Sequence, residues 1–350
     1  MIFASDNWSG ASDRIITALA EAARKGGPAY GNDDLTKVVE RRLAEVFEHD
    51  VAVFLVASGT AANALALSAY ARPGGVIFCH REAHINVDEA GASEFFGGGA
   101  KVVGLDAAGG KIAPETLAEG LTKFPEGAVH HGRPIAVSVT QITELGMAYT
   151  SAEVAALAKV AKGRGAAVHM DGARFANAIA GQNGSPADMT WRAGVDVLSL
   201  GGTKNGCVAA EAVVFFDPTH ARDVGFARQR AGQGFSKNWF IAAQLDAYLK
   251  DDHWLKLARH ANTMATRLAS ALEKSGKARL AFELGGNEVF AIIEKGVDTR
   301  LRAAGAVYHP WTTDSLPIAE RPGAGEVVVR MVTSWQTMPA DVDKLATLLA

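Results

Sequence analysis

Seven short apolar runs, separated by segments with helical spacing, constrain the fold of this chain more than any other feature. They lie at 51–56, 76–79, 101–105, 135–140, 166–170, 195–200 and 212–216. Several are continuously apolar rather than alternating, which is typical of strands that are covered on both faces. Strands that alternate with helices form a mostly parallel sheet between helical layers. We therefore expect an α/β fold built on a seven-stranded, mostly parallel sheet.

The helices between these runs have recognisable boundaries. Thr150 and Glu153 have the spacing of a capping box, and apolar residues follow at helical spacing until Gly163. Another helix is expected at 60–71, directly after a small-residue turn. These helices supply the crossovers that a parallel sheet requires.

The pattern changes after about residue 245. A long helix is expected at 253–274, followed by short strand candidates at 287–293, 306–308 and 326–332 and a closing helix near 341–349. Two prolines and two glycines mark the segment 312–325 as a loop. We expect a large domain over residues 1–245 and a smaller α+β domain over 246–350.

Composition narrows the functional class. Nearly half of the residues are hydrophobic and about a fifth are charged, as in ordinary soluble globular proteins. The formal net charge is −3 without long runs of either sign, so we expect neither a nucleic acid nor a membrane as partner. Cys79 and Cys207 cannot build a disulfide framework and fit a reducing compartment. No signal peptide or membrane span is recognisable, so we expect a cytoplasmic enzyme, and we expect no metal ion.

Two of the apolar runs end at residues that suggest cofactor chemistry. The run at 195–200 opens into Gly201 and Gly202, and Lys204 follows; the run at 166–170 ends at Asp171. A lysine near the protein interior loses its charge readily and can form an imine, although a lysine after glycines is more often a phosphate-binding or surface residue. An aspartate and a lysine at the ends of separate strands suit pyridoxal phosphate, because the first pairs with the ring nitrogen and the second with the aldehyde.

A phosphate site is also indicated. Ser58, Gly59 and Thr60 lie between the first strand candidate and the helix that follows it. The free backbone N–H groups and positive dipole at such a helix start favour an anion. Simple capping of the helix by Ser58 is the alternative.

The remaining candidates are histidines and arginines. His84 follows the second strand candidate, where its ring could stack on a flat cofactor or move a proton; a solvated loop histidine is the alternative. The same alternatives apply to His130 and His131. Arg174 and Arg330 are candidates for binding a carboxylate, and a buried structural salt bridge is the alternative for Arg330.

These motifs, in this order and at these intervals, are similar to those of the low-specificity L-threonine aldolases. These are pyridoxal-phosphate enzymes of fold type I, within the group of β-eliminating lyases and threonine aldolases. The resemblance runs nearly end to end. It rests on residues 4–7, 29–33, 58–63, 83–84, 88–92, 140–146, 169–178, 201–206 and 330–335.

The resemblance implies how the cofactor would be held. Lys204 would form the imine with the cofactor and Asp171 would keep the ring nitrogen protonated. His84 would stack on the ring, while Gly59 and Thr60 would bind the phosphate.

It also implies a substrate site that two subunits share. Ser5, Arg174 and Arg330 would hold the substrate carboxylate, and His130 would lie near the substrate hydroxyl. Tyr30 would come from a neighbouring subunit, because family members form dimers, usually assembled into tetramers. Segment 1–35 would contribute to that dimer interface.

Two departures from the family pattern concern the substrate side. Gly132 stands where a proline is expected after the histidine pair, which leaves the choice between His130 and His131 open. The loop at 311–325, just before Arg330, is longer than usual.

The activity implied is cleavage of L-threonine, L-allo-threonine or a related β-hydroxy amino acid such as L-phenylserine to glycine and an aldehyde. Such an enzyme would take part in threonine catabolism and glycine biosynthesis. Another fold type I lyase, such as a β-eliminating one, shares the Asp171–Lys204 pair. A non-catalytic binding module on the same frame would be expected to lack these residues.

Overall fold

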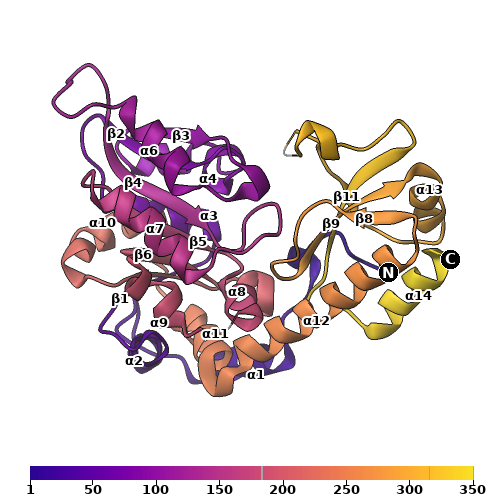
Figure 1. The fold of residues 1–350 in the computed structure, drawn as a ribbon. Coiled ribbons are helices and arrows are strands. Elements are labelled where there is room, and N and C mark those ends of the chain that lie inside the picture. Colours follow the sequence, from indigo (N-terminus) through magenta and orange to yellow (C-terminus); the bar gives the residue numbers. More distant parts are fainter. Residues whose placement is uncertain (183, 315, 350) are drawn as a thin grey trace.

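Two lobes of unequal size make up the computed structural model, which describes residues 1–182, 184–314 and 316–349 (Figure 1). The larger lobe is built on a seven-stranded sheet and the smaller lobe on a four-stranded sheet. Helix α12 (His253–Lys274) packs against elements of both lobes and matches the bounds expected from the sequence.

The large sheet has the strand order β1-β7-β6-β5-β4-β2-β3. Only β7 runs antiparallel to its neighbours, so the expectation of a mostly parallel sheet is confirmed. Each strand lies within two residues of its expected bounds. The strands are β1 (Ala52–Val56), β2 (Gly75–His80), β3 (Lys101–Leu105), β4 (Arg133–Thr140), β5 (Ala167–Gly172), β6 (Val197–Gly201) and β7 (Glu211–Phe215).

Helices cover this sheet on both faces. The capping box expected at Thr150 and Glu153 is present at the start of α7. None of the helices in the described ranges is long and apolar enough to cross a membrane. Those of the larger lobe are α1 (Asp13–Lys25), α2 (Asp34–Phe47), α3 (Gly59–Ser68), α4 (His84–Val87), α5 (Ala92–Phe96), α6 (Pro114–Thr122), α7 (Ser151–Lys162), α8 (Phe175–Gly181), α9 (Pro186–Met189), α10 (Val224–Arg230) and α11 (Trp239–Leu249).

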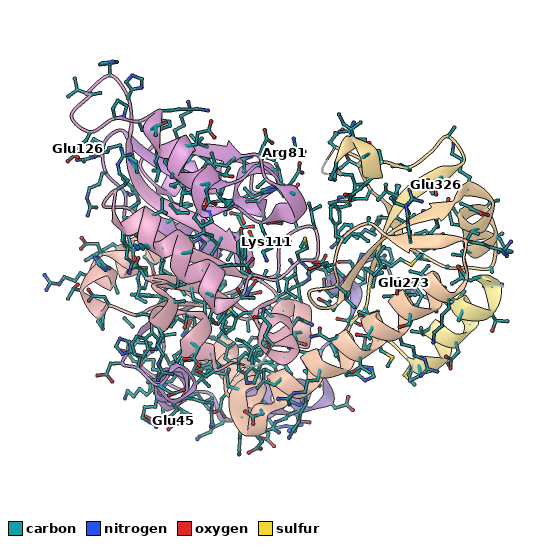
Figure 2. The ribbon with its side chains drawn as sticks, viewed as in Figure 1. Glu45, Arg81, Lys111, Glu126, Glu273 and Glu326 are labelled. Carbon is teal, nitrogen blue, oxygen red and sulfur yellow. The ribbon has the colours of Figure 1, made fainter. Side chains whose placement is uncertain are left out.

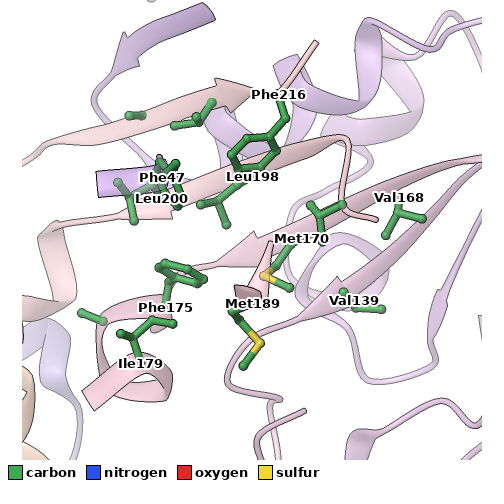
Figure 3. Close-up of a cluster of buried hydrophobic side chains, with 14 of the residues drawn as sticks. Phe47, Val139, Val168, Met170, Phe175, Ile179, Met189, Leu198, Leu200 and Phe216 are labelled. Atoms are coloured by element: carbon green, nitrogen blue, oxygen red, sulfur yellow. The ribbon is translucent and has the colours of Figure 1, made fainter. Parts of the chain in front are cut away.

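A dense apolar core lies directly beneath the strand ends that carry the predicted site (Figure 3). Val168 and Met170 of β5 and Leu198 of β6 are fully buried in it. Because side chains alternate along a strand, Asp171 lies on the opposite face of β5 from Met170. Packing of the apolar residues therefore fixes which way Asp171 points.

The smaller lobe is an antiparallel sheet with the order β10-β11-β9-β8. The strand expected at 306–308 forms instead at 309–310, and the three-residue β8 was not expected, because so short a segment shows no periodicity. Two further helices complete the lobe. The elements are β8 (Ala278–Leu280), β9 (Glu288–Glu294), α13 (Lys295–Ala303), β10 (His309–Pro310), β11 (Glu326–Val332) and α14 (Pro339–Leu349).

The chain begins in the smaller lobe. Phe3 is fully buried in the core of that lobe, and its backbone bonds to Val307 and Val332 at 2.8 Å each. We expected residues 1–35 to lie with the large domain, but the first three are held by the small sheet. The segment then crosses to the larger lobe at α1, which brings residues 5–7 between the lobes.

Candidate active site

One cavity of about 270 Å³ collects most of the predicted cofactor residues. It lies outside the carboxyl ends of the parallel strands, where α/β proteins bind their ligands. Its lining comes from segments far apart in the sequence. The lining residues are Asn7, Ala57, Ser58, Gly59, Thr60, Asn63, His84, Glu89, Thr140, Ile142, Glu144, Asp171, Ala173, Arg174, Thr203, Lys204 and Glu211.

Asp171 and Lys204 lie in this cavity together. Asp171 is near the end of β5, and Lys204 lies in a 3₁₀ turn (Thr203–Asn205) that follows the neighbouring strand β6. Asp171 accepts hydrogen bonds from Asn63 Nδ2 at 2.9 Å and from the Ala173 amide at 3.0 Å. These two hydrogen bonds hold the carboxylate in place at the edge of the cavity.

Gly201 and Gly202, which precede Lys204, leave no room for a side chain because other backbone segments pass close to them. A Cβ atom on Gly201 would lie 2.5 Å from the carbonyl oxygen of Ala173, and one on Gly202 would lie 2.6 Å from that of Ala210. The Gly202 amide donates to Glu211 Oε2 at 2.9 Å. Burial raises the pKa of the Glu211 carboxyl to about 7. The turn that presents Lys204 is thus packed against backbone on two sides.

The start of α3 forms another wall of the cavity. Ser58 caps the helix by accepting a hydrogen bond from the Ala61 amide at 3.3 Å, so the capping alternative for Ser58 holds. Gly59 and Thr60 follow in the first turn, and no atom lies within 4 Å of where a Cβ on Gly59 would be. The space beside Gly59 is therefore open, as the close approach of a phosphate to this helix start requires.

A hydrogen-bonded chain fixes His84. Its Nδ1 lies 2.9 Å from Glu89 Oε1. Asn63 Nδ2 donates to the same Glu89 oxygen at 2.8 Å and also to Asp171, so it links the two carboxylates. The hydrogen bond to Glu89 raises the pKa of His84. His84 and Asp171, both predicted from the sequence, are therefore joined through Asn63 and Glu89.

Glu144 binds the backbone of His84 with its carboxyl group. Its Oε1 accepts from the His84 amide at 2.8 Å and from Thr140 Oγ1 at 3.0 Å. Burial raises the pKa of Glu144 to about 7, and its Oε2 has no hydrogen-bond partner within the described residues.

These features fit pyridoxal phosphate. The cavity offers an anion for the ring nitrogen, an amine for the aldehyde and a helix start for the phosphate. The buried oxygens Asn63 Oδ1 and Glu89 Oε2 also lack partners within the described residues. Unpaired polar atoms are uncommon in buried sites unless a ligand or water satisfies them.

The two predicted carboxylate-binding arginines are paired with acids of the protein. Arg174 binds Asp6 through Nε at 2.7 Å and Nη2 at 2.9 Å. Glu288 lies between Arg174, at 3.1 Å, and Arg330, at 2.8 Å. Arg174 lines the cavity but Arg330 does not. Arg330 thus forms a structural salt bridge, which was the alternative to carboxylate binding in the sequence analysis. Binding of the substrate by Arg174 or Arg330 stays a prediction.

Ser5 and Tyr30 do not line the cavity in this single chain. Ser5 Oγ accepts from the Asn7 amide at 3.1 Å, and Asn7 is a lining residue. Tyr30 is 59% exposed in a turn with a positive φ of 59°. Its predicted role requires a neighbouring subunit and stays a prediction.

His130 lies outside the site that the single chain forms. It is exposed in the loop between α6 and β4, next to His131, with ring centroids 4.5 Å apart. This loop protrudes where Glu126 is labelled in Figure 2, at the end of β4 opposite to Thr140. Neither histidine reaches the cavity within one chain, because the sequence placed them before β4 whereas the site lies after it.

The loop at 311–325, which we expect to be longer than usual, approaches the larger lobe. Arg81 Nη2 donates to the Asp314 carbonyl at 2.9 Å, and Arg81 lies on the side of the larger lobe that faces the smaller one (Figure 2). Trp311 packs beneath the Arg330 guanidinium, 5.5 Å from ring centroid to Cζ. Position 315 of this loop lies outside the described residues.

Sequence reasoning assigned no role to several acidic and amide residues of the site. Asp6, Asn63, Glu89, Glu144 and Glu211 all contact or border the predicted residues. One signal was available for Glu144, which follows β4 near the edge of the sheet where Asp171 lies near the end of β5. Glu211 begins β7, directly before the run expected at 212–216. Asn63 of α3, Glu89 in the turn after α4 and Asp6 of the N-terminal segment lie outside every strand pattern.

Comparison with known proteins agrees with this geometry. A family model described as beta-eliminating lyase matches residues 3–293. The chain is 37% identical to a low specificity L-threonine aldolase of Pseudomonas aeruginosa, over 99% of this chain and 95% of the relative. It is also 37% identical to one from a Pseudomonas species, over 98% and 95%. A solved threonine aldolase structure from Leishmania major has a TM-score of 0.91 at 26% identity, covering 99% and 98% of the two chains.

The chain belongs to the beta-eliminating lyase family. Its fold is that of the threonine aldolases, so the expected fold type I architecture, with a smaller second sheet, is confirmed. Pyridoxal phosphate is the cofactor, and the cavity lined by Asp171 and Lys204 fits it.

Proposed function

We propose that this protein is a pyridoxal-phosphate-dependent aldolase that cleaves L-threonine, L-allo-threonine and related L-β-hydroxy-α-amino acids to glycine and an aldehyde. The observation that carries the proposal is the nearly full-length similarity to low specificity L-threonine aldolases, together with one cavity that holds Asp171, Lys204, His84 and the start of α3.

Each of these residues has a defined task. When bound, the cofactor supplies a conjugated ring system that accepts the electron pair of the breaking Cα–Cβ bond. Lys204 Nζ would provide the attachment point, and the Asp171 carboxylate would hold a proton at the ring nitrogen. The backbone amides of Gly59 and Thr60 would bind the phosphate.

The substrate must be held in one orientation so that the Cα–Cβ bond is the one that breaks. We propose that Arg174, with Arg330 and Ser5, holds the substrate carboxylate for this purpose. A base must also remove the proton of the β-hydroxyl group, directly or through water. His84 is our candidate, since it borders the cavity, and His130 is a second candidate only if a neighbouring subunit supplies it.

Product analysis tests the proposal. The purified protein with added pyridoxal phosphate should release glycine and acetaldehyde from L-threonine, and benzaldehyde from L-phenylserine where that substrate fits. A panel with L-allo-threonine and both phenylserine diastereomers also measures selectivity at Cβ. Release of ammonia and a keto acid instead would favour a β-eliminating lyase. Inactivity on every β-hydroxy amino acid would contradict the assignment.

The Lys204→Ala variant tests the attachment point. We expect aldehyde production to fall on the order of 10³-fold or more, because the amine that binds the cofactor is removed. The yellow protein-bound chromophore should also disappear near neutral pH. Lys274→Ala, at an exposed lysine at the end of α12, is the matched control and should keep both signals. A Lys204→Ala protein that retains them would contradict the assigned role.

We also propose that the active enzyme is a cytoplasmic homodimer or homotetramer whose sites are shared between subunits. The support is that Tyr30 is exposed and lies outside the cavity of a single chain, although the family resemblance gives it a role at the site. Light scattering of the purified protein measures the mass. A monomeric, fully active protein would contradict the shared site.

A further inference from the structure

The carboxylate of Glu288 lies between the two arginines that are expected to bind the substrate carboxylate. Its Oε2 is 3.1 Å from Arg174 Nη1, and its Oε1 is 2.8 Å from Arg330 Nη2 and 3.1 Å from Arg330 Nε. The side chain is only 1% exposed. Glu288 therefore makes the contacts with this pair of guanidinium groups that a bound amino acid would be expected to make.

Each guanidinium group of this pair already faces a carboxylate. Asp6 binds the other edge of Arg174 with two hydrogen bonds, while Glu288 binds Arg330 and contacts Arg174. A substrate carboxylate that joined them would add a further negative charge beside arginines that are already paired. Buried charge without a partner is strongly unfavourable. The substrate therefore has to compete with Glu288 rather than meet an unpaired pair of arginines.

The two contacts of Glu288 differ in quality. Oε1 accepts two aligned hydrogen bonds from Arg330, and Trp311 supports that guanidinium from below. Oε2 approaches Arg174 as an ion pair but has no hydrogen bond of good geometry within the described residues. Arg174 is also the arginine that lines the cavity. The contact that a substrate would displace is thus the weaker one.

The position of Glu288 is firmly set by its surroundings. It is the first residue of β9 and pairs with Val332 of β11. The preceding residue, Asn287, donates to Asp6 Oδ2 at 3.0 Å and to the Thr333 carbonyl at 2.7 Å. The backbone at Glu288 is therefore anchored, and only its side chain needs to move.

We propose that Glu288 is a specificity-determining residue that competes with the substrate carboxylate for Arg174 and Arg330. The proposal rests on the aldolase assignment above and deepens it. Glu288 neutralises the carboxylate subsite, which lowers its affinity for α-amino acids. As a result, an amine of similar size that lacks a carboxylate binds with an affinity closer to that of an amino acid.

Spectral titration of the holoenzyme tests this directly, with glycine and glycinamide as ligands. In the Glu288→Gln variant, which keeps the side-chain shape but removes its charge, the Kd for glycine should fall by about tenfold, the effect expected of one charge-assisted hydrogen bond. The Kd for glycinamide should stay within about twofold of wild type. Glu294→Gln, an exposed glutamate at the other end of β9, is the matched control and should change neither Kd.

A glycine Kd that rises or stays unchanged in Glu288→Gln, or an equal shift for both ligands, would overturn the proposal and make Glu288 a structural support for the arginines. Wild-type protein alone gives a second test in case the variant fails to fold. Its preference for glycine over glycinamide should be less than about tenfold, and a larger preference would also overturn the proposal. These titrations measure ligand binding and not product formation. They can therefore be interpreted even if the aldolase assay fails, so the aldolase proposal and the Glu288 proposal can be contradicted separately.

Discussion

Glu144 is a buried carboxyl group whose protonation should be visible in the stability of the protein. Its folded-state pKa is about 7, against 4.5 in the unfolded chain. A raised folded pKa gives a stability contribution that is complete below about pH 4.5 and is lost as the pH rises through about 7.

We therefore expect Glu144→Gln to gain stability over wild type as the pH rises. Between pH 5 and pH 8 the difference in free energy of unfolding should move by about 2–3 kcal/mol in favour of the variant, since each unit of pKa shift corresponds to about 1.4 kcal/mol. Urea denaturation of the cofactor-free proteins measures it. Glu119→Gln on α6, which is exposed, serves as control. A pH-independent difference between Glu144→Gln and wild type would show that Glu144 stays ionised in the folded protein.

The first turn of α3 is the element on which phosphate affinity should depend. Thr60 lines the cavity directly after the Ser58 cap. Thr60→Val keeps the side-chain shape but removes the hydroxyl group, so we expect binding of pyridoxal phosphate to weaken about tenfold. Binding of pyridoxal, which has no phosphate, should change little.

The comparison of the two ligands separates a phosphate contact from general damage to the helix. Ser68→Ala at the other end of α3 loses only its bond to the Leu65 carbonyl and should bind both ligands as wild type does. If Thr60→Val weakened pyridoxal and pyridoxal phosphate equally, the phosphate would lie elsewhere in the cavity.

At the scale of the whole molecule, Asp6 connects three parts of the chain. It lies in the segment that leads from the smaller lobe to α1, binds Arg174 of the larger lobe and accepts a hydrogen bond from Asn287 beside β9. Burial opposes its ionisation, but Arg174, Lys204 and Asn287 together lower the pKa of Asp6. Its contribution to stability is therefore complete above about pH 3.8 and is lost as the pH falls through the folded value.

We expect Asp6→Asn to destabilise the protein by about 3–5 kcal/mol at neutral pH, because the variant leaves a buried guanidinium short of one charge. Thermal or urea unfolding measures this loss. Asp223→Asn, at an exposed residue whose side chain does not cap its helix, should cost less than about 0.5 kcal/mol. Equal stability of the two variants would mean that Arg174 finds another partner when Asp6 is neutral.

The sequence by itself determined the large sheet, because seven apolar runs of strand length can be buried only between layers of helices. It also indicated candidate cofactor residues at or soon after the ends of those strands, and parallel strands bring their carboxyl ends to one edge. Asp171, Lys204, His84 and Thr60 meet in one cavity for this reason.

The tertiary structure alone decided how the charges of the substrate side are paired. Periodicity describes a residue relative to its own strand or helix, whereas Asp6 and Glu288 reach Arg174 from the N-terminal segment and a second sheet, and Arg330 joins them through Glu288. The same limit applies to His130, to which the family resemblance gave a role but which one chain leaves exposed and outside the cavity. Contacts between segments far apart in sequence depend on how the lobes pack, and no local pattern encodes that packing.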